Sequence, residues 1–325
     1  MARDASSRRS RFLRGNHDPE AKFPQVPLSS CEVYAVRPMD GIPDKPGKKP
    51  FLETDLFHDA VQQFWSSKQS ATSKKSQGGA RDQNLHGKTM NGFIEAVRDF
   101  LIALGVRPEH VFAGGNLSNA PPVLPSYFRP SKNWDLIVVA NSRFHSKEQG
   151  SGGPVLYAAL ELKSQDKSIG NNQNNRLEES IGNAHDFWVT YGQSGFERLQ
   201  PRPWLGYLFV GKYQPGADNV QVRIKQPHFL AMPPFRVEGS DASATYLGPS
   251  YAARYMMFLR QAVAARLYDS GAFLVTAEDL AGKRPNHRIL MPEFGPAAFL
   301  RGLKAQILAH YPGAEVRPGT WPAQI

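Results

Sequence analysis

The chain has 325 residues, of which 41% are hydrophobic and 21% charged, a composition that excludes a mostly disordered chain and allows a sizeable core. Its longest apolar runs, LIVVA and VLYAAL, are too short to cross a bilayer, so no membrane span is expected. The 39 Lys and Arg against 29 Asp and Glu give a net charge of +10. This surplus fits a polyanionic partner such as nucleic acid and, equally, a merely basic soluble protein.

The first fifty residues are predicted to form a flexible basic tail. Residues 1–50 hold ten Lys and Arg against six Asp and Glu, with no sustained apolar period. Its arginines could touch DNA phosphates or simply be solvated. No apolar secretory region is visible, and Cys31 is a single cysteine, so a reducing cytoplasm is expected and a zinc site is not.

Helices and strands then alternate along residues 51–325. Apolar periodicity predicts helices at 52–65 and 87–105, separated by a polar basic loop at 66–84, and Gly105 suits the position after a helix end. Short apolar runs predict a ribbon of two strands, 134–140 and 155–165, and further strands follow. The strands 204–211 and 271–276 and the helices 174–192, 250–268 and 296–311 complete the prediction. Strands mixed with helices indicate an α/β fold.

Three charged residues lie beside the apolar runs of the predicted ribbon. Asp135 opens one strand, and Glu161, Lys163 and Gln165 alternate along one face of the other. Charged groups at the edge of a core cost free energy unless they are paired or bind a metal, and hard carboxylate oxygens suit Mg²⁺. An exposed set of salt bridges at the strand ends explains the same residues equally well.

The spacing of these residues is that of the PD-(D/E)xK nucleases. In that pattern, Asp135 and Glu161 are the metal ligands, the carbonyl of Leu162 is a third, and Lys163 is the catalytic ammonium. The metal polarises the scissile phosphate, and the lysine orients or deprotonates the attacking water. The triplet alone is weak evidence, because Glu20-Ala21-Lys22 repeats it where no strand supports it.

Longer stretches of the chain resemble the XhoI-type restriction endonuclease family. The resemblance covers about residues 55–270 and includes FRPSKNWDLIVV, ALELKSQ, IGNNQNNRLEESIGNAHDFW, QPRPWLGYLFV, PHFLAMPPF and YAARYMMFLRQAVAARLY. It implies a restriction-endonuclease-like mixed β-sheet core flanked by helices. On this reading residues 51–325 form the nuclease domain, with a helical extension at the C-terminus.

The resemblance also implies a function. Such enzymes are Type IIP restriction endonucleases that cut double-stranded DNA at the palindrome CTCGAG after the first C, leaving 5′ overhangs. They need Mg²⁺, are expected to act as homodimers because a palindrome mirrors a two-fold axis, and accompany a cognate DNA methyltransferase. Two alternatives remain, namely a structure-selective repair nuclease of the same fold and a catalytically inactive DNA-binding protein.

Further residues are candidates for contacts with DNA or for auxiliary roles. The segment that follows the catalytic strand is dense in amide and guanidinium donors, which suit base edges and phosphates, although it also fits an Asn-rich loop that caps a helix. The candidate DNA contacts are Asn171, Asn172, Gln173, Asn174, Asn175, Arg176, Lys132 and Lys88. Gln165 is a candidate for orienting the phosphate, and packing at the strand end explains it equally well. Glu95 or Asp99 is a candidate for an outer carboxylate, although a solvated helix face explains both better. Lys88 and Lys132 also fit the simpler interpretation of solvated surface lysines. His185 and Trp188 are expected to be structural.

Overall fold

The computed structural model describes residues 56–74, 89–115, 117–141, 154–166, 169–196, 201–212, 219–223, 232, 235 and 245–316. All of them lie in one of the two units into which the chain divides, Ala35–Ile325. The predictions for residues 1–50 and for Lys88 fall outside the described residues, and so are neither confirmed nor contradicted.

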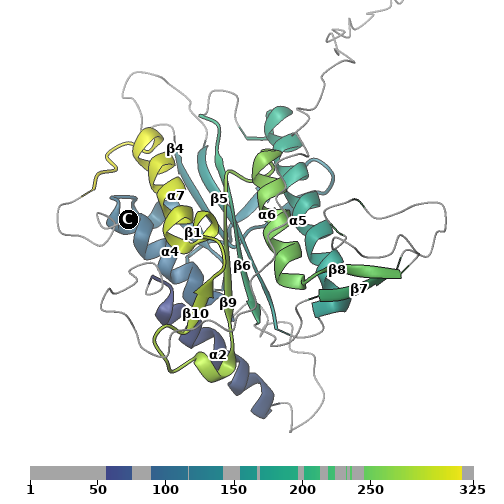
Figure 1. The fold of residues 1–325 in the computed structure, drawn as a ribbon. Helices are drawn as coiled ribbons and strands as arrows, with labels where there is room; N and C mark the ends of the chain where they lie inside the picture. Colours follow the sequence, from purple (N-terminus) through teal and green to yellow (C-terminus); the bar gives the residue numbers. More distant parts are fainter. Residues whose placement is uncertain are drawn as a thin grey trace, which may run out of the picture. The chain divides into compact units, whose positions relative to one another are not determined.

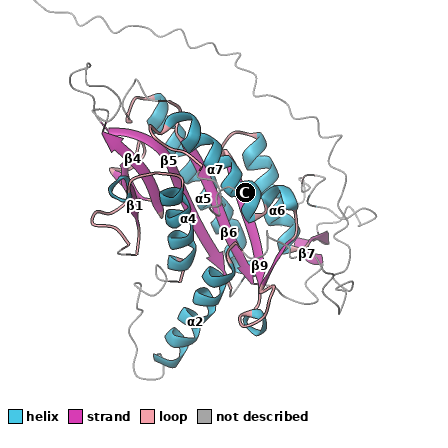
Figure 2. Ribbon diagram, turned by 90° about the vertical axis from the view of Figure 1, so that its left-hand side faces the viewer, coloured by secondary structure: helices cyan, strands magenta, loops and turns pink. Residues whose placement is uncertain are grey.

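Within the described residues, a six-stranded mixed sheet with the order β1-β4-β5-β6-β9-β10 forms the centre of the fold (Figure 2). The pairs β5–β6 and β6–β9 are parallel, and the other pairs are antiparallel. The strands are β1 (Val111–Ala113), β4 (Leu136–Asn141), β5 (Pro154–Gln165), β6 (Trp204–Lys212), β9 (Ser270–Thr276) and β10 (His287–Ile289). The predicted ribbon of two strands is therefore confirmed as the antiparallel pair β4–β5.

Helices cover both faces of the sheet (Figure 1). One face packs against α2 (His58–Lys74), α4 (Asn91–Ala103) and α7 (Pro296–His310), and the other against α5 (Ile169–Gly192) and α6 (Tyr251–Ala264). Strands that are covered on both sides are apolar throughout, which explains the unbroken runs in β4, β5 and β6. The α/β class with a mixed sheet and flanking helices is confirmed.

Alternation along β5 decides which side chains reach which helices. Leu160 and Leu162 belong to the core on the α4 side, whereas Ala159 belongs to the core on the α5 side. Since successive side chains of a strand point to opposite faces, Glu161 and Lys163 point to the same side as Ala159, towards α5. Glu161 and Lys163 therefore both lie on the side of the sheet that α5 covers.

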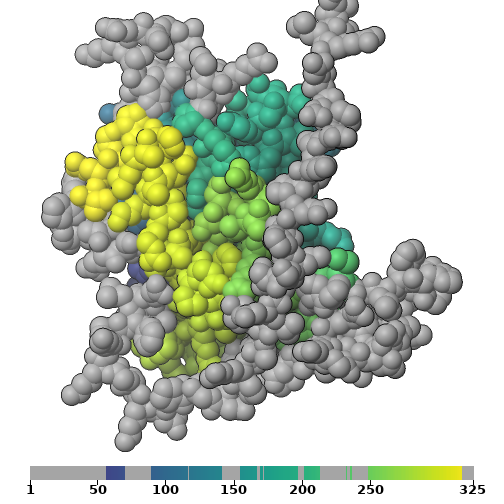
Figure 3. All heavy atoms as spheres, turned by 45° about the horizontal axis from the view of Figure 1, so that its top comes forward, coloured from purple at the N-terminus to yellow at the C-terminus, as the bar shows by residue number. Residues whose placement is uncertain are grey.

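The C-terminal helix α7 belongs to the core. Phe299, Leu300, Leu303 and Ile307 are buried in the cluster that includes Leu160 and Leu162. The space-filling view shows the C-terminal residues, in yellow, beside the green and teal residues of the middle of the chain (Figure 3). The helix predicted at 296–311 is confirmed.

Other boundaries differ from the predictions. Helix α2 continues to Lys74, so the loop predicted from residue 66 is wrong at its start. Lys68 explains part of the extension, because its ammonium lies 4.7 Å from the centre of the Phe64 ring and 2.9 Å from Asp166. Gly105 follows the end of α4 with a φ of +87°, which confirms its predicted position.

Several short elements are additional to the predictions. They are the two-stranded pairs β2 (Val123–Pro125) with β3 (Ser131–Asn133) and β7 (Asn219–Arg223) with β8 (Thr245–Pro249), and the 3₁₀ turns η3 (Pro108–His110), η6 (Glu278–Leu280) and η7 (Pro292–Phe294). In the part of the chain that the structure describes, no helix combines the length and the apolar character that crossing a membrane requires.

Candidate active site

Asp135 lies where β4 and β5 begin to separate. Its backbone N–H still donates to the carbonyl of Leu160 at 3.1 Å, but the N–H of Leu162 donates to the Asp135 carboxylate at 2.6 Å. The Asp135 side chain thus accepts the next hydrogen bond from β5, at the point where the backbone pairing between β4 and β5 ends. Burial raises the pKa of Asp135 to about 6, although the Leu162 N–H and the nearby Lys163 oppose the rise.

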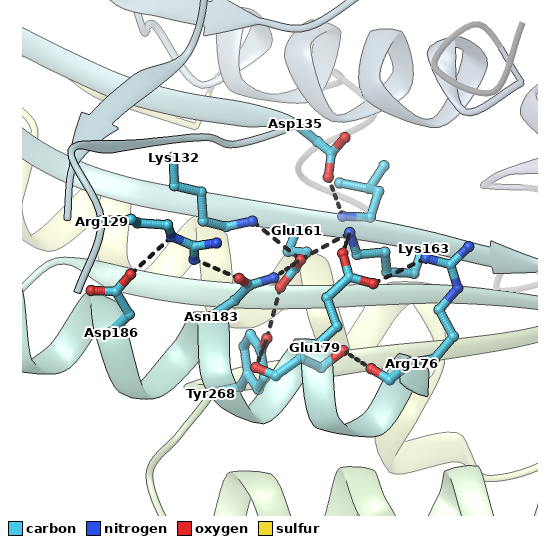
Figure 4. A network of polar contacts seen from close by, with 12 residues as sticks. Arg129, Lys132, Asp135, Glu161, Lys163, Arg176, Glu179, Asn183, Asp186 and Tyr268 are labelled. Carbon is cyan, nitrogen blue, oxygen red and sulfur yellow. Dashed lines mark hydrogen bonds and ion pairs between the residues drawn. The ribbon is translucent and has the colours of Figure 1, made fainter. Parts of the chain in front are cut away.

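Glu161 is buried and held from four directions, with only 1% of the residue exposed. Asn183 donates to its Oε1 at 2.6 Å and Tyr268 donates to its Oε2 at 2.9 Å. The ammonium groups of Lys163 and Lys132 lie 3.1 and 3.3 Å from Oε1. Figure 4 shows these partners converging on the carboxylate from the strand, the helix α5 and more distant parts of the chain. Such a network satisfies a charge that would be costly to bury alone.

Lys163 lies between two carboxylates. Besides the contact with Glu161, its Nζ donates to Oε1 of Glu179 on α5 at 2.8 Å. Burial favours the neutral amine, but both carboxylates outweigh it and raise the pKa of Lys163, so the side chain is an ammonium. Burial would raise the pKa of Glu179, yet Lys163 and Arg176 lower it. Oε2 of Glu179 accepts from Arg176 at 3.0 Å.

A polar cavity of about 630 Å³ opens beside these residues. Its charged lining is balanced, with the cations Lys68, Lys163 and Arg176 against the acids Asp135, Asp166 and Glu179. The remaining lining residues are Thr89, Met90, Leu162, Ser164, Gln165, Asn172 and Asn175. Glu161 does not line the cavity, because its carboxylate is turned into the network behind Lys163.

The donors at this cavity fit a hard divalent cation. Asp135 and Leu162 line the cavity, and a cation there would offset the cost of burying the Asp135 carboxylate. Glu161, the second carboxylate of the segment, faces its internal partners and not the cavity in this conformation. Among the described residues, no group of three or more His, Cys, Asp or Glu is clustered as metal ligands. Water and substrate oxygens would therefore have to complete the coordination, as is common for Mg²⁺.

The Asn-rich segment is helical rather than a loop. Helix α5 begins at Ile169, so Asn174 and Asn175 lie inside its first turns and do not cap it. Asn172, Asn175 and Arg176 line the cavity. Gln173 is fully buried and donates to the carbonyl of Tyr251 at 2.9 Å, which does not fit a direct contact with DNA. The backbone of Asn171 also belongs to α5.

Three other candidates do not line the cavity. Lys132 turns inward to Glu161 and lies 4.6 Å from the centre of the Trp134 ring, and its contact with phosphate stays a prediction. Glu95 and Asp99 lie on α4; Met90 at the start of this helix lines the cavity, but Glu95 and Asp99 do not.

Gln165 lines the cavity, but its side chain is engaged at both ends. Its amide nitrogen donates to the carbonyl of Ile169 at 3.4 Å, and its amide oxygen accepts from the hydroxyl of Tyr255. Gln165 therefore ties the end of β5 to the start of α5 and to α6. These contacts give it a structural role beside the predicted one.

A second polar cluster adjoins Glu161. Asp186 on α5 is buried, and its carboxylate accepts from the backbone N–H groups of Tyr127 and Phe128 at 2.8 and 3.2 Å and from Nε of Arg129 at 3.0 Å. These bonds and that of Ser126 lower the pKa of Asp186, although burial alone would raise it. Arg129 also donates to Asn183 at 2.6 Å, so the segment 126–129 is joined through Asn183 to Glu161 (Figure 4).

Sequence reasoning missed Glu179, Asn183, Asp186 and Tyr268. Three of them, with Arg176, share a signal, because positions 176, 179, 183 and 186 recur at helical spacing and form one polar face of α5. Tyr268 lies 107 residues from Glu161 in sequence, and no local pattern indicates their contact.

The comparisons with known proteins decide the family. The family model described as restriction endonuclease XhoI matches residues 68–286. The chain belongs to the XhoI restriction endonuclease family. The match confirms the resemblance seen in the motifs and extends past residue 270, through β9 to the start of β10. Members of this family are Type II restriction enzymes, which are site-specific deoxyribonucleases that generally use a divalent metal ion and act on double-stranded DNA.

Individual relatives agree with the assignment to the XhoI family. The Type II restriction enzyme BstVI of Geobacillus stearothermophilus is 36% identical over 61% of this chain and 78% of its own length. AbrI of Azospirillum brasilense is 35% identical over 58% of this chain and 78% of its own. XhoI of Xanthomonas vasicola is 34% identical over 62% of this chain and 72% of its own. No solved structure matches the chain.

Proposed function

We propose that this member of the XhoI family is a Mg²⁺-dependent Type IIP restriction endonuclease that recognises CTCGAG and cuts after the first C to leave 5′ overhangs. One observation carries the chemical part of the proposal. Asp135 and the segment Glu161–Lys163 come together where β4 and β5 separate, and a polar cavity lies beside them. The specific site rests on the resemblance to the XhoI family.

In this proposal Asp135, Glu161 and the carbonyl of Leu162 would hold Mg²⁺, which polarises the scissile phosphate and lowers the pKa of bound water. Lys163 is charged and lies on the cavity wall, so it donates hydrogen bonds to the phosphate and offsets the negative charge that grows in the transition state. Glu161 keeps Lys163 protonated and fixes the direction of its ammonium group, and Glu179 also contacts this ammonium in the free protein. Tyr268 and Asn183 in turn hold Glu161.

The biological setting follows from the same proposal. A palindromic site is read by a two-fold symmetric protein, so the enzyme acts as a homodimer in which each subunit cuts one strand. A cognate methyltransferase protects the host DNA, and the enzyme works in the cytoplasm. Sedimentation of the protein with and without a CTCGAG duplex tests the dimer directly.

Cleavage of plasmid DNA with Mg²⁺ and with EDTA, followed by run-off sequencing of the ends, tests the function. Discrete Mg²⁺-dependent fragments with 5′-TCGA overhangs are expected. Discrete cuts at another palindrome would overturn the proposed site and keep the mechanism. A smear or cutting confined to junctions would favour a repair nuclease, and binding without any cutting would indicate an inactive DNA-binding protein.

Substitution of Lys163 tests the assignment of the catalytic ammonium. Lys163→Ala should reduce cleavage by a factor of about 10²–10³, as expected when a group that stabilises transition-state charge is removed, while a CTCGAG duplex is still bound. Lys22→Ala is a matched control, because Lys22 belongs to the other acid-x-Lys triplet of the chain, Glu20-Ala21-Lys22. A Lys163→Ala enzyme as active as Lys22→Ala would show that the site is misplaced.

A further inference from the structure

Glu179 bridges two cations on the wall of the cavity. Its Oε1 lies 2.8 Å from Nζ of Lys163, and its Oε2 lies 3.0 Å from Nη1 of Arg176. Each oxygen of the carboxylate thus serves a different cation. The two cations come from different elements, Lys163 from β5 and Arg176 from α5, and all three residues line the cavity (Figure 4).

The two carboxylates that contact Lys163 differ in how firmly they are held. Glu161 is 1% exposed and has Asn183 and Tyr268 as further donors. The side chain of Glu179 is 41% exposed, and its carboxylate contacts the two cations themselves. An ion pair with that much access to water contributes little stability and is easily exchanged. Glu179 is therefore the carboxylate that an incoming anion can replace.

We infer that Lys163 and Arg176 form a phosphate subsite for DNA, and that Glu179 occupies this subsite in the free protein and is displaced when DNA binds. The ligand is a backbone phosphodiester, whose two non-bridging oxygens match the two oxygens that Glu179 presents to the cations. This inference rests on the proposed function, because it takes DNA as the anion.

The rest of the cavity lining also fits an anionic ligand. Such a ligand would compete with the protein's own carboxylates for the cations of the cavity. Lys68 is also paired there, at 2.9 Å from Asp166. Asn172 and Asn175 of α5 add amide groups to the same wall. A cavity whose cations already have carboxylate partners binds DNA more weakly than its basic residues alone would allow. Glu179 consequently lowers the affinity for any DNA and leaves contacts with the bases to decide which DNA is bound.

Salt-dependent DNA binding by Glu179→Gln tests this inference, with Glu178→Gln as the matched control. Glu178 is exposed on the same turn of α5, carries the same charge and does not line the cavity. Binding is measured in EDTA with a duplex that lacks CTCGAG, so that neither cleavage nor base recognition contributes. Glu179→Gln should bind about five- to tenfold more tightly than Glu178→Gln at 0.1 M salt, and the slope of log K against log salt should steepen by about one.

A second variant locates the effect. In an Arg176→Gln background, adding Glu179→Gln should give a smaller gain than in the wild-type chain, because one of the two cations is missing. Equal or weaker binding of Glu179→Gln relative to Glu178→Gln would overturn the inference, whether or not cleavage is also lost. Wild-type cleavage with Mg²⁺ is scored separately. A protein that cuts no DNA but shows the expected binding difference would disprove the proposed function and leave the phosphate subsite supported.

Discussion

Replacing Asp135 by Asn should make the metal-free protein more stable while it ends cleavage. Burial raises the pKa of this carboxyl group from its ordinary value of 3.8 to about 6. Between these two pH values the folded protein holds a proton that the unfolded chain releases, so the free energy of unfolding falls as the pH rises through this window. About two pKa units correspond to roughly 3 kcal/mol, which is lost in full above pH 6.

Asparagine has the same shape and no charge, and its amide oxygen can still accept the hydrogen bond from the N–H of Leu162. Asp135→Asn should therefore raise the free energy of unfolding by about 3 kcal/mol at pH 8 and by about 1 kcal/mol at pH 4.5. For a domain of this size the gain at pH 8 is on the order of 10 °C in Tm. The protein would become more stable because it loses a group that its function requires.

Urea denaturation in EDTA at both pH values measures the effect, with plasmid cleavage in Mg²⁺ as the parallel assay. Asp279→Asn is the control, because this carboxylate is 76% exposed and its ion pair with Lys283 spans 3.7 Å. Adding Mg²⁺ should narrow the difference in stability, because only the wild-type carboxylate would bind the ion. An Asp135→Asn protein that is less stable than wild type at pH 8, or equally stabilised at both pH values, would refute the reasoning.

Two further substitutions test the networks around the site. Glu161→Ala should lower the free energy of unfolding by about 3–5 kcal/mol in urea denaturation, because it removes the carboxylate that pairs with the partly buried Lys132. Glu161→Gln should lose less, because its amide oxygen can still accept hydrogen bonds from Asn183 and Tyr268; equal losses would contradict a contribution from these hydrogen bonds. Asp186→Ala should release the segment 126–129 and speed chymotryptic cleavage after Phe128, and an unchanged cleavage rate would contradict this. Because the pKa of Asp186 is lowered, its stabilisation is lost as the pH falls, opposite to Asp135.

The part of the site that lies on adjacent strands could be predicted from the sequence. Asp135, Glu161 and Lys163 flank apolar runs, and two such runs joined by a loop pair as a ribbon, which brings the three residues together. Which side of the sheet they face also follows from alternation along β5. These inferences depend on local periodicity, which a single sequence carries.

The helix α5 marks the limit of that reasoning. The sequence alone does not fix the first residue of α5, because Asn is a poor helix former and a good helix cap. Tertiary contacts such as the hydrogen bond from Gln173 to the carbonyl of Tyr251 override that preference. The burial of Glu161 depends on Tyr268, and the inward turn of Lys132 depends on Glu161 and Trp134. Such contacts depend on packing between segments that are distant in sequence. The local sequence around Lys132 does not contain this information and therefore predicted an exposed lysine that contacts DNA.

Asp186 fixes the backbone of the segment 126–129 through hydrogen bonds that do not involve the side chains of Tyr127 and Phe128. Asp186 accepts hydrogen bonds from the main chain of Tyr127 and Phe128, whose side chains are 56% and 66% exposed. The identity of these two side chains is thus not dictated by the bonds that fix their backbone. Mutation can alter what this outer surface presents while the residues around Glu161 stay in place.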